Sequence, residues 1–176
     1  MNWEHTGEGV WTARDEVVLA GPPQVERLLR EAAAAPKKRA RLCAHAGPDA
    51  RVHEMLIAFR GDTYVRPHRH LDKSESFHVV TGRARVVIFS NDGRVERLIE
   101  LGPPGSGHPF FFRIATPLYH TLLLDGDELV LHETTSGPFV RGDAEFPDWA
   151  PAETEPPDVL DAYKRSLTAS SGRDEA

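Results

Sequence analysis

Eight short apolar segments of strand type follow one another between residues 52 and 133, and turn-forming residues separate them. Branched and aromatic residues are frequent within the segments, while glycine, proline, asparagine and aspartate stand between them. Short strands at such close spacing are typical of a β-barrel or β-sandwich rather than of a helix bundle. The expected strands are residues 52–60, 63–70, 76–80, 84–90, 95–101, 110–114, 120–124 and 128–133.

Local patterns add a hairpin and two helices to this β framework. The sequence Asn91-Asp92-Gly93 tolerates positive φ and predicts an antiparallel hairpin between the strands on either side of it. Apolar residues at helical spacing predict an amphipathic helix over residues 22–35. A second, short helix near the C-terminus is indicated by Val159, Leu160, Tyr163 and Leu167.

The chain has 176 residues and a mass of 19.6 kDa, which is the size of one domain with a single core. We expect residues 1–40 to form an N-terminal arm and helix packed on the body, residues 41–140 a β-barrel, and residues 141–176 a tail. The tail is acidic and contains proline, with nine Asp/Glu against four Lys/Arg. We expect this tail to be partly disordered, above all at its last residues.

Composition argues against several classes of partner. The formal net charge is −6, and there is no Lys/Arg-rich cluster backed by aromatic residues, so we expect no nucleic-acid surface. No apolar stretch has membrane-spanning length, and the first residues lack the pattern of a signal peptide, so we expect no membrane partner. Cys43 is the only cysteine, which excludes an intrachain disulfide and fits a reducing compartment. The expected location is the cytoplasm.

The strongest functional signal is a set of metal-ligand types. His68 and His70 are two residues apart, so they share one face of a strand, and Glu75 follows after a short connection. His120 lies about fifty residues further on and is brought back by the fold. Three neutral nitrogens and one carboxylate suit a borderline divalent metal ion. Chance proximity is the competing interpretation, because the chain has nine histidines, but it would leave buried charge uncompensated.

These residues resemble the first sequence motif of the cupin superfamily, in which a glycine, an H-x-H pair, a glutamate and a second glycine occur in this order. The matching residues are Gly61, His68, His70, Glu75 and Gly82. His120 takes the place of the histidine of the second motif. The resemblance implies an all-β fold: a single cupin barrel (a double-stranded β-helix or jelly roll) with a short N-terminal helix and a C-terminal tail.

Within the superfamily, the chain resembles the WbuC-type cupin metalloproteins, which are associated with bacterial polysaccharide gene clusters. The segments that carry this resemblance are residues 39–45, 53–55, 64–70, 73–79 and 132–139. The resemblance implies one divalent metal ion, for which the ligands leave Fe, Zn, Mn and Ni open. It also implies a homodimer, and the arm that carries Trp3 and Trp11 is the candidate contact.

Strand alternation sorts the neighbours of the metal ligands. If His68 and His70 point into the barrel, Tyr64 and Arg66 share their face and line the cavity. We therefore assign Tyr64 a catalytic role and Arg66 a role in substrate binding.

Three further residues are candidates, each with a structural alternative. Glu133 is a second catalytic candidate, because alternation sends one member of the His132-Glu133 pair inward. Lys73 is a candidate for binding an anionic substrate, although an exposed loop lysine is usually solvated. His53 is either a hydrogen-bonded core histidine or a substrate-binding residue of the cavity.

Two classes of function remain open at this point. The first is a metal-dependent enzyme of isomerase, epimerase or dioxygenase type that acts on a small molecule, a sugar or a small hydroxy acid, in polysaccharide metabolism. The second is a non-catalytic, metal-dependent module that binds or senses a sugar. A metal-free epimerase is a third option, ranked below these because all four ligand residues are present.

Overall fold

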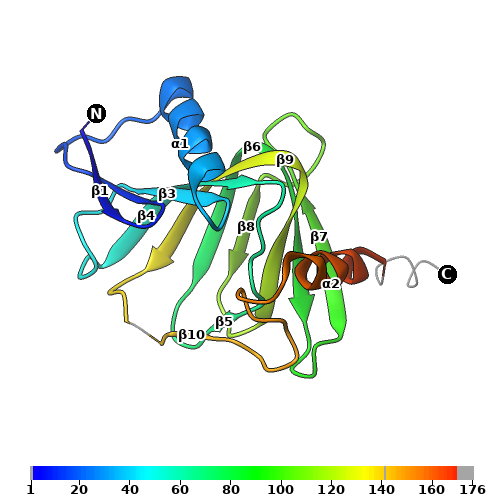
Figure 1. The fold of residues 1–176 in the computed structure, drawn as a ribbon. Coiled ribbons are helices and arrows are strands. Elements are labelled where there is room, and N and C mark those ends of the chain that lie inside the picture. The colour runs from blue at the N-terminus through cyan, green and yellow to red at the C-terminus, as the bar shows by residue number, and fades with distance from the viewer. Residues whose placement is uncertain (1, 141, 170–176) are drawn as a thin grey trace.

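The computed structural model describes residues 2–140 and 142–169 of the chain. The disorder predicted for the last residues falls on residues 170–176, which lie outside the described part. In chain order the elements are β1 (Trp3–Gly7), β2 (Val10–Ala13), α1 (Pro22–Ala34), β3 (Arg39–Cys43), β4 (Val52–Arg60), β5 (Arg69–His70), β6 (Glu75–Phe89), β7 (Val95–Leu101), β8 (Phe111–Ile114), β9 (Tyr119–Ser136), β10 (Ala144–Glu145) and α2 (Pro157–Ala169) (Figure 1).

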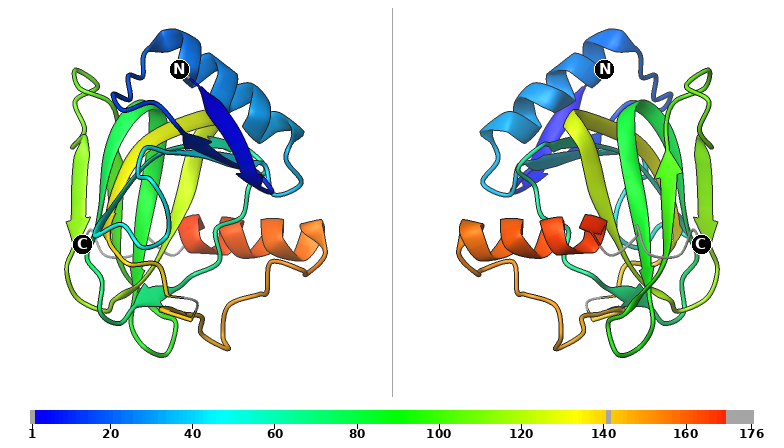
Figure 2. Two further views of the ribbon diagram at one scale, coloured as in Figure 1. Left: turned by 90° about the vertical axis from the view of Figure 1, so that its left-hand side faces the viewer. Right: turned by 90° about the vertical axis from the view of Figure 1, so that its right-hand side faces the viewer.

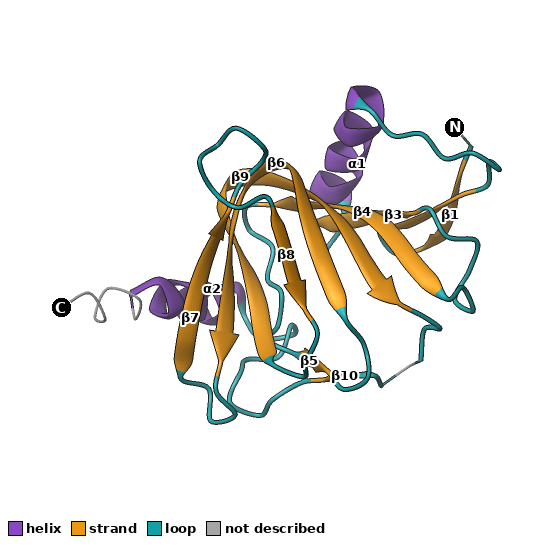
Figure 3. Cartoon of the chain, turned by 180° about the vertical axis from the view of Figure 1, so that it is seen from behind, coloured by secondary structure: helices purple, strands orange, loops and turns teal. Residues whose placement is uncertain are grey.

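Two long strands, β6 and β9, form the centre of the fold. They pair antiparallel along nearly their whole length, and both bend midway (Figure 3). The first half of β6 pairs with β8 and the second half with β7, while the second half of β9 also pairs with β4. The path then continues through β3 and β2 to β1, so eight strands form one strongly curved sheet.

Gly82 stands at the bend of β6. The register between β6 and β9 shifts on both sides of it, and its φ is +83°. A Cβ atom here would lie 2.2 Å from the carbonyl oxygen of Glu128 on β9, so a larger residue does not fit without a shift of the backbone. A glycine at this position lets the long strands turn while they remain paired.

Apolar residues pack on both surfaces of the curved sheet. The inner surface carries the main core, which includes Met55, Phe77 and Leu131. On the outer surface, α1 packs through Leu28 and Ala32 against β3, β4 and β9. A separate cluster joins α2 and the segment before it to β6, β7 and β9 (Figure 2). The inner surface is therefore the place where a cavity can form.

The strand prediction is confirmed in most of its segments. The expected strands at residues 52–60 and 95–101 have the bounds of β4 and β7. The expected helix at residues 22–35 is α1, and the helix indicated near Tyr163 is α2. Near the N-terminus, β1 and β2 form an antiparallel hairpin, and β2 also pairs with β3.

Three details of the predicted architecture were wrong. The strand expected at residues 63–70 is reduced to β5, because residues 63–67 run as an irregular connection. Two pairs of expected strands are each one continuous strand, β6 and β9, since the pairing continues through the bends. The barrel is not closed by hydrogen bonds: in the described residues the strand path ends at β1 and β7, which do not pair with each other.

Among the described residues, no helix is long and apolar enough to cross a membrane.

Candidate metal centre

His68 and His120 are held side by side by their own backbones. The amide of His68 donates to the carbonyl oxygen of His120 at 3.0 Å, and the amide of His120 donates to that of His68 at 2.9 Å. Residues that exchange both hydrogen bonds in an antiparallel pair project their side chains from the same face. The two imidazole ring centroids are accordingly 4.6 Å apart.

The same two rings are fixed in orientation by backbone carbonyl groups. Nδ1 of His68 donates to the carbonyl oxygen of Arg66 at 2.9 Å, and Nδ1 of His120 donates to that of Leu118 at 2.9 Å. These bonds place the ring proton on Nδ1 and leave the Nε2 lone pair available. This is the tautomer that a histidine needs in order to bind a metal ion through Nε2.

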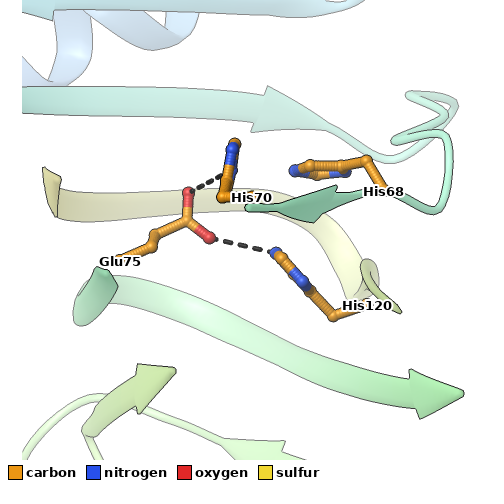
Figure 4. Close-up of side chains that lie close together, drawn as sticks. All are labelled: His68, His70, Glu75 and His120. Carbon is orange, nitrogen blue, oxygen red and sulfur yellow. Dashed lines mark hydrogen bonds and ion pairs between the residues drawn. The ribbon is translucent and has the colours of Figure 1, made fainter. Parts of the chain in front are cut away.

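His70 and Glu75 complete the group from neighbouring elements. His70 lies in β5, and Glu75 begins β6 (Figure 4). One carboxyl oxygen of Glu75 is 3.0 Å from Nε2 of His120, and the other is 3.8 Å from Nε2 of His70. One potential ligand atom from each of the four residues lies within 4.8 Å of the others. The structure thus brings together all four residues predicted as ligands.

Burial keeps the three imidazoles neutral. It is the largest cause of the lowered pKa of His68 and His120, and it lowers the pKa of His70 to about 4, with a further contribution from His68. Burial also raises the pKa of Glu75 to about 7, so this carboxyl can share a proton with His120. Neutral histidines need to lose no proton to bind a metal ion, and a cation would replace the proton of Glu75.

The donor set therefore fits one divalent metal ion. Nδ1 of His70 is buried and has no hydrogen-bond partner among the described residues, so the polar groups of this site are incompletely satisfied by the protein alone. Three imidazole nitrogens and a carboxylate suit Fe, Zn, Mn or Ni, and the ligand types alone do not choose among these metals.

The four residues border two adjoining chambers on the inner surface of the sheet. The smaller chamber has a volume of about 280 Å³ and is lined by all four of them. The larger chamber, of about 620 Å³, shares His70 and Glu75 with the smaller one and extends toward the β1–β2 hairpin. Glu133 and Arg41 line both chambers. A substrate thus has room next to the metal site and a second space beyond it.

Glu133 is the inward member of the His132-Glu133 pair. Its register partners are Met55 on β4 and Phe77 on β6, both residues of the inner core. His132 faces a different pocket, on the outer surface. Burial, and then the proximity of Glu75, raise the pKa of Glu133 to about 8, so its carboxyl is largely protonated at neutral pH.

Arg66 and Tyr64 were both predicted to line the cavity, but only Arg66 does so. Arg66 lines the smaller chamber, where its guanidinium stacks over Phe146 and donates to the carbonyl oxygen of Pro147 at 3.0 Å. The hydroxyl of Tyr64 donates to the carbonyl oxygen of Pro151 at 2.9 Å and lies outside both chambers. The prediction that Tyr64 lines the cavity was wrong. It assumed the side-chain alternation of a strand, and residues 63–67 do not form one.

Lys73 and His53 both lie on the wall of the larger chamber. The ammonium group of Lys73 is 2.7 Å from the carboxylate of Asp143, which neutralises it. Nε2 of His53 is 3.1 Å from the carbonyl oxygen of Pro48, and its ring stacks on that of His45. His53 is therefore a buried, hydrogen-bonded histidine that also borders the cavity.

Two groups of residues that line the chambers were not predicted as site residues. Arg41 projects inward from β3, together with Arg39 and Cys43. Phe146 and Glu153 reach the smaller chamber from the C-terminal segment. The alternation Arg39-Ala40-Arg41-Leu42-Cys43 was a usable signal for Arg41, whereas the C-terminal residues carry no comparable local pattern.

Comparisons with known proteins identify the fold but no activity. A family model described as Domain of unknown function (DUF6016) matches residues 22–101. No curated protein matches the sequence.

Solved structures with similar folds include the following two. One is CapF with the inhibitor 3-isopropenyl-tropolone, with a TM-score of 0.52 and 19% identity, covering 64% of this chain and 32% of that one. The other is salicylate 1,2-dioxygenase from Pseudoaminobacter salicylatoxidans in complex with gentisate, with a TM-score of 0.52 and 16% identity, covering 70% of this chain and 36% of that one. The matched region is thus about a third of each of these proteins. Both are cupin-fold proteins, so the fold of this chain is of the cupin type.

Proposed function

We propose that the protein is a metal-dependent enzyme that moves a proton on a small oxygen-rich molecule, a sugar or a hydroxy acid. The observation that carries this proposal is the position of Glu133. Glu133 lines both chambers, the smaller of which is also lined by His68, His70, Glu75 and His120, and burial raises the pKa of its carboxyl to about 8. A carboxyl with a pKa near the working pH is suited to general acid and base catalysis.

The residues that line the chambers would have different roles in the reaction. A divalent ion held by the four ligands would act as a Lewis acid on a substrate oxygen. Glu133 would donate a proton to, or accept one from, the substrate beside that oxygen. The apolar inner wall, with Ile57, Leu131 and Phe146, would exclude water from the reacting atoms. This arrangement favours an isomerase or epimerase.

Three observations bear on the substrate and on where the enzyme works. The resemblance to WbuC-type cupins favours a sugar and a place in bacterial polysaccharide metabolism. The dioxygenase among the similar structures supports a small molecule in the cavity of this fold. The single cysteine fits a reducing compartment, and we propose that the enzyme works in the cytoplasm.

Deuterium exchange tests this proposal. The metal-loaded protein is incubated in D2O with a panel of sugars, nucleotide sugars and hydroxy acids, and exchange at carbon is followed by NMR. We expect exchange with at least one compound, a loss of about 100-fold or more for Glu133→Gln, and an unchanged metal content in that variant.

Two results would contradict the proposal. If a sugar binds tightly and no compound exchanges, the protein is a binding module rather than an enzyme. If oxygen is consumed at a rate that Glu133→Gln does not change, the chemistry is oxidative and Glu133 is not its proton carrier.

A further inference from the structure

Arg41 projects into the cavity from the middle of β3. Its register partner on β4 is Ile57, which in turn pairs with Leu131 on β9, and both of these residues belong to the inner core. Paired residues of neighbouring strands project from the same face of a sheet, so the Arg41 side chain faces inward as well. It lines both chambers, with His70 and Glu75 of the metal site.

The other cationic side chains of the two chambers are already engaged. Arg39 is 2.8 Å from the carboxylate of Glu153, and Lys73 is paired with Asp143. Arg14 is 2.5 Å from Glu4. Each of these pairs satisfies a positive charge within the protein.

Arg66 and Arg41 are the two that form no direct ion pair with a carboxylate among the described residues. Arg66 uses its guanidinium on the carbonyl oxygens of Pro147 and Ala150 and on the ring of Phe146. Arg41 lies near the buried carboxyls of Glu75 and Glu133 and lowers the pKa of both against the larger effect of burial, but within the described part of the chain its guanidinium makes no direct hydrogen bond or ion pair with either of them. The N–H donors of this partly buried guanidinium are therefore free to bind an anion directly.

We propose that Arg41 binds the carboxylate of the substrate, which is therefore a small organic acid rather than a neutral sugar. This inference rests on the proposed function, because it names the substrate class of the same site. A guanidinium presents a planar pair of N–H donors that matches a carboxylate, and those of Arg41 are not taken up by a carboxylate of the described residues. A metal ion beside Arg41 would add to the attraction, since it brings two positive charges against one from Glu75.

The shape of the cavity extends this assignment. Arg41 stands where the two chambers share their wall, so a carboxylate bound to it lies beside the metal site. A hydroxyl group on the adjacent carbon would then be directed toward the four ligands. The rest of the molecule would occupy the larger chamber, where Val10, Met55 and Phe139 supply apolar surface. A 2-hydroxy acid meets these requirements.

Acids paired with their own amides test the inference, because each pair differs in charge and little else. The probes are lactate, mandelate and gluconate with lactamide, mandelamide and gluconamide, and binding to the metal-loaded chain is measured by calorimetry. We expect at least one acid to bind 10-fold or more tightly than its amide. In Arg41→Met, the affinity for the acid should fall to that of the amide, and Arg41→Lys should be intermediate because it keeps the charge but not the paired donors.

Arg39→Met is the matched control, since Arg39 lies on the same strand and face but is paired with Glu153. This variant should keep the preference for the acid. The inference is overturned if no acid binds, if acid and amide bind equally, or if Arg41→Met keeps the preference, which would mean that the metal alone captures the acid. Tighter binding of glycerol phosphate than of every acid would overturn the assignment to a carboxylate.

Metal content and deuterium exchange, measured on the same samples, separate this inference from the proposed function. Protein without metal, or exchange that survives Glu133→Gln, would count against the proposed function. Equal binding of acid and amide by the wild-type protein, or a preference that survives in Arg41→Met, with metal content and exchange intact, would count against the role of Arg41 alone.

Discussion

Glu75 and Glu133 place two carboxyl groups in one cavity, and their pKa values are raised mainly by burial. A group whose pKa is raised by folding stabilises the folded state fully below its unfolded pKa, which is about 4.3 for glutamate. That contribution is lost as the pH rises toward about 8, the pKa of folded Glu133. The metal-free protein is therefore expected to lose stability between these values.

Thermal unfolding in the presence of a chelator checks this expectation. As the pH rises from 5.5 to 8.5, the Tm of the wild-type protein should fall by about 2–4 °C more than that of Glu133→Gln, which corresponds to roughly 1 kcal/mol. Glutamine keeps the size of the side chain and has no proton to lose. Parallel curves for the two proteins would show that Glu133 does not titrate differently in the folded state.

Among individual residues, the metal ligands could be predicted from the sequence. The other residues that line the site could be predicted only in part. His68, His70 and Glu75 are close in the chain, so their spacing alone indicated a common site. Alternation in residues 39–43 places Arg41 on one face of a strand, but that this face points to the site depends on the register across β3, β4 and β9. Tyr64 was assigned by assuming a strand that the chain does not form.

At the scale of elements, the bends of β6 and β9 decide how the two halves of the sheet face each other. The sequence at residues 81–83 and 125–127 has turn character, which predicted breaks between separate strands. In the structure the pairing of β6 and β9 continues past Gly82, with shifts of register. Sequence patterns showed where the chain turns but not that the hydrogen-bonded ladder continues, because that depends on the partner strand.

Replacement of Gly82 by alanine tests the bend. We expect Gly82→Ala to lower the free energy of unfolding by about 3 kcal/mol or more, since it adds a clash with Glu128 to the cost of a positive φ. Gly105→Ala is the matched control: its φ is +87° and no atom lies within 4 Å of the added Cβ, so about 1–2 kcal/mol is expected. Denaturant unfolding gives both values, and equal losses would contradict the role of the close contact.

At the scale of the whole molecule, segments from both ends of the chain meet at the cavity. Thr6 and Val10 from the N-terminal hairpin line the larger chamber, and Phe146 and Glu153 from the C-terminal segment line the smaller one. These contacts join residues more than a hundred positions apart, so no local pattern predicted them. The order of strands could be anticipated only through the resemblance to cupins.

The homodimer remains a prediction at this scale. Chromatography with light scattering should give twice the chain mass of 19.6 kDa for the protein, and a single mass for a chain that begins at Pro22. The reason is that β1 is an edge strand of the sheet, with unpaired backbone groups available to a second copy. An unchanged state of association after the truncation would refute a dimer formed through the arm.

The proposed function depends on one metal ion held jointly by His68, His70, Glu75 and His120. The most direct measurement is elemental analysis of the protein purified without chelator, beside the double variant His68→Ala/His70→Ala. We expect about one divalent ion per chain in the wild-type protein and almost none in the folded variant. Equal metal content in the two proteins would contradict it.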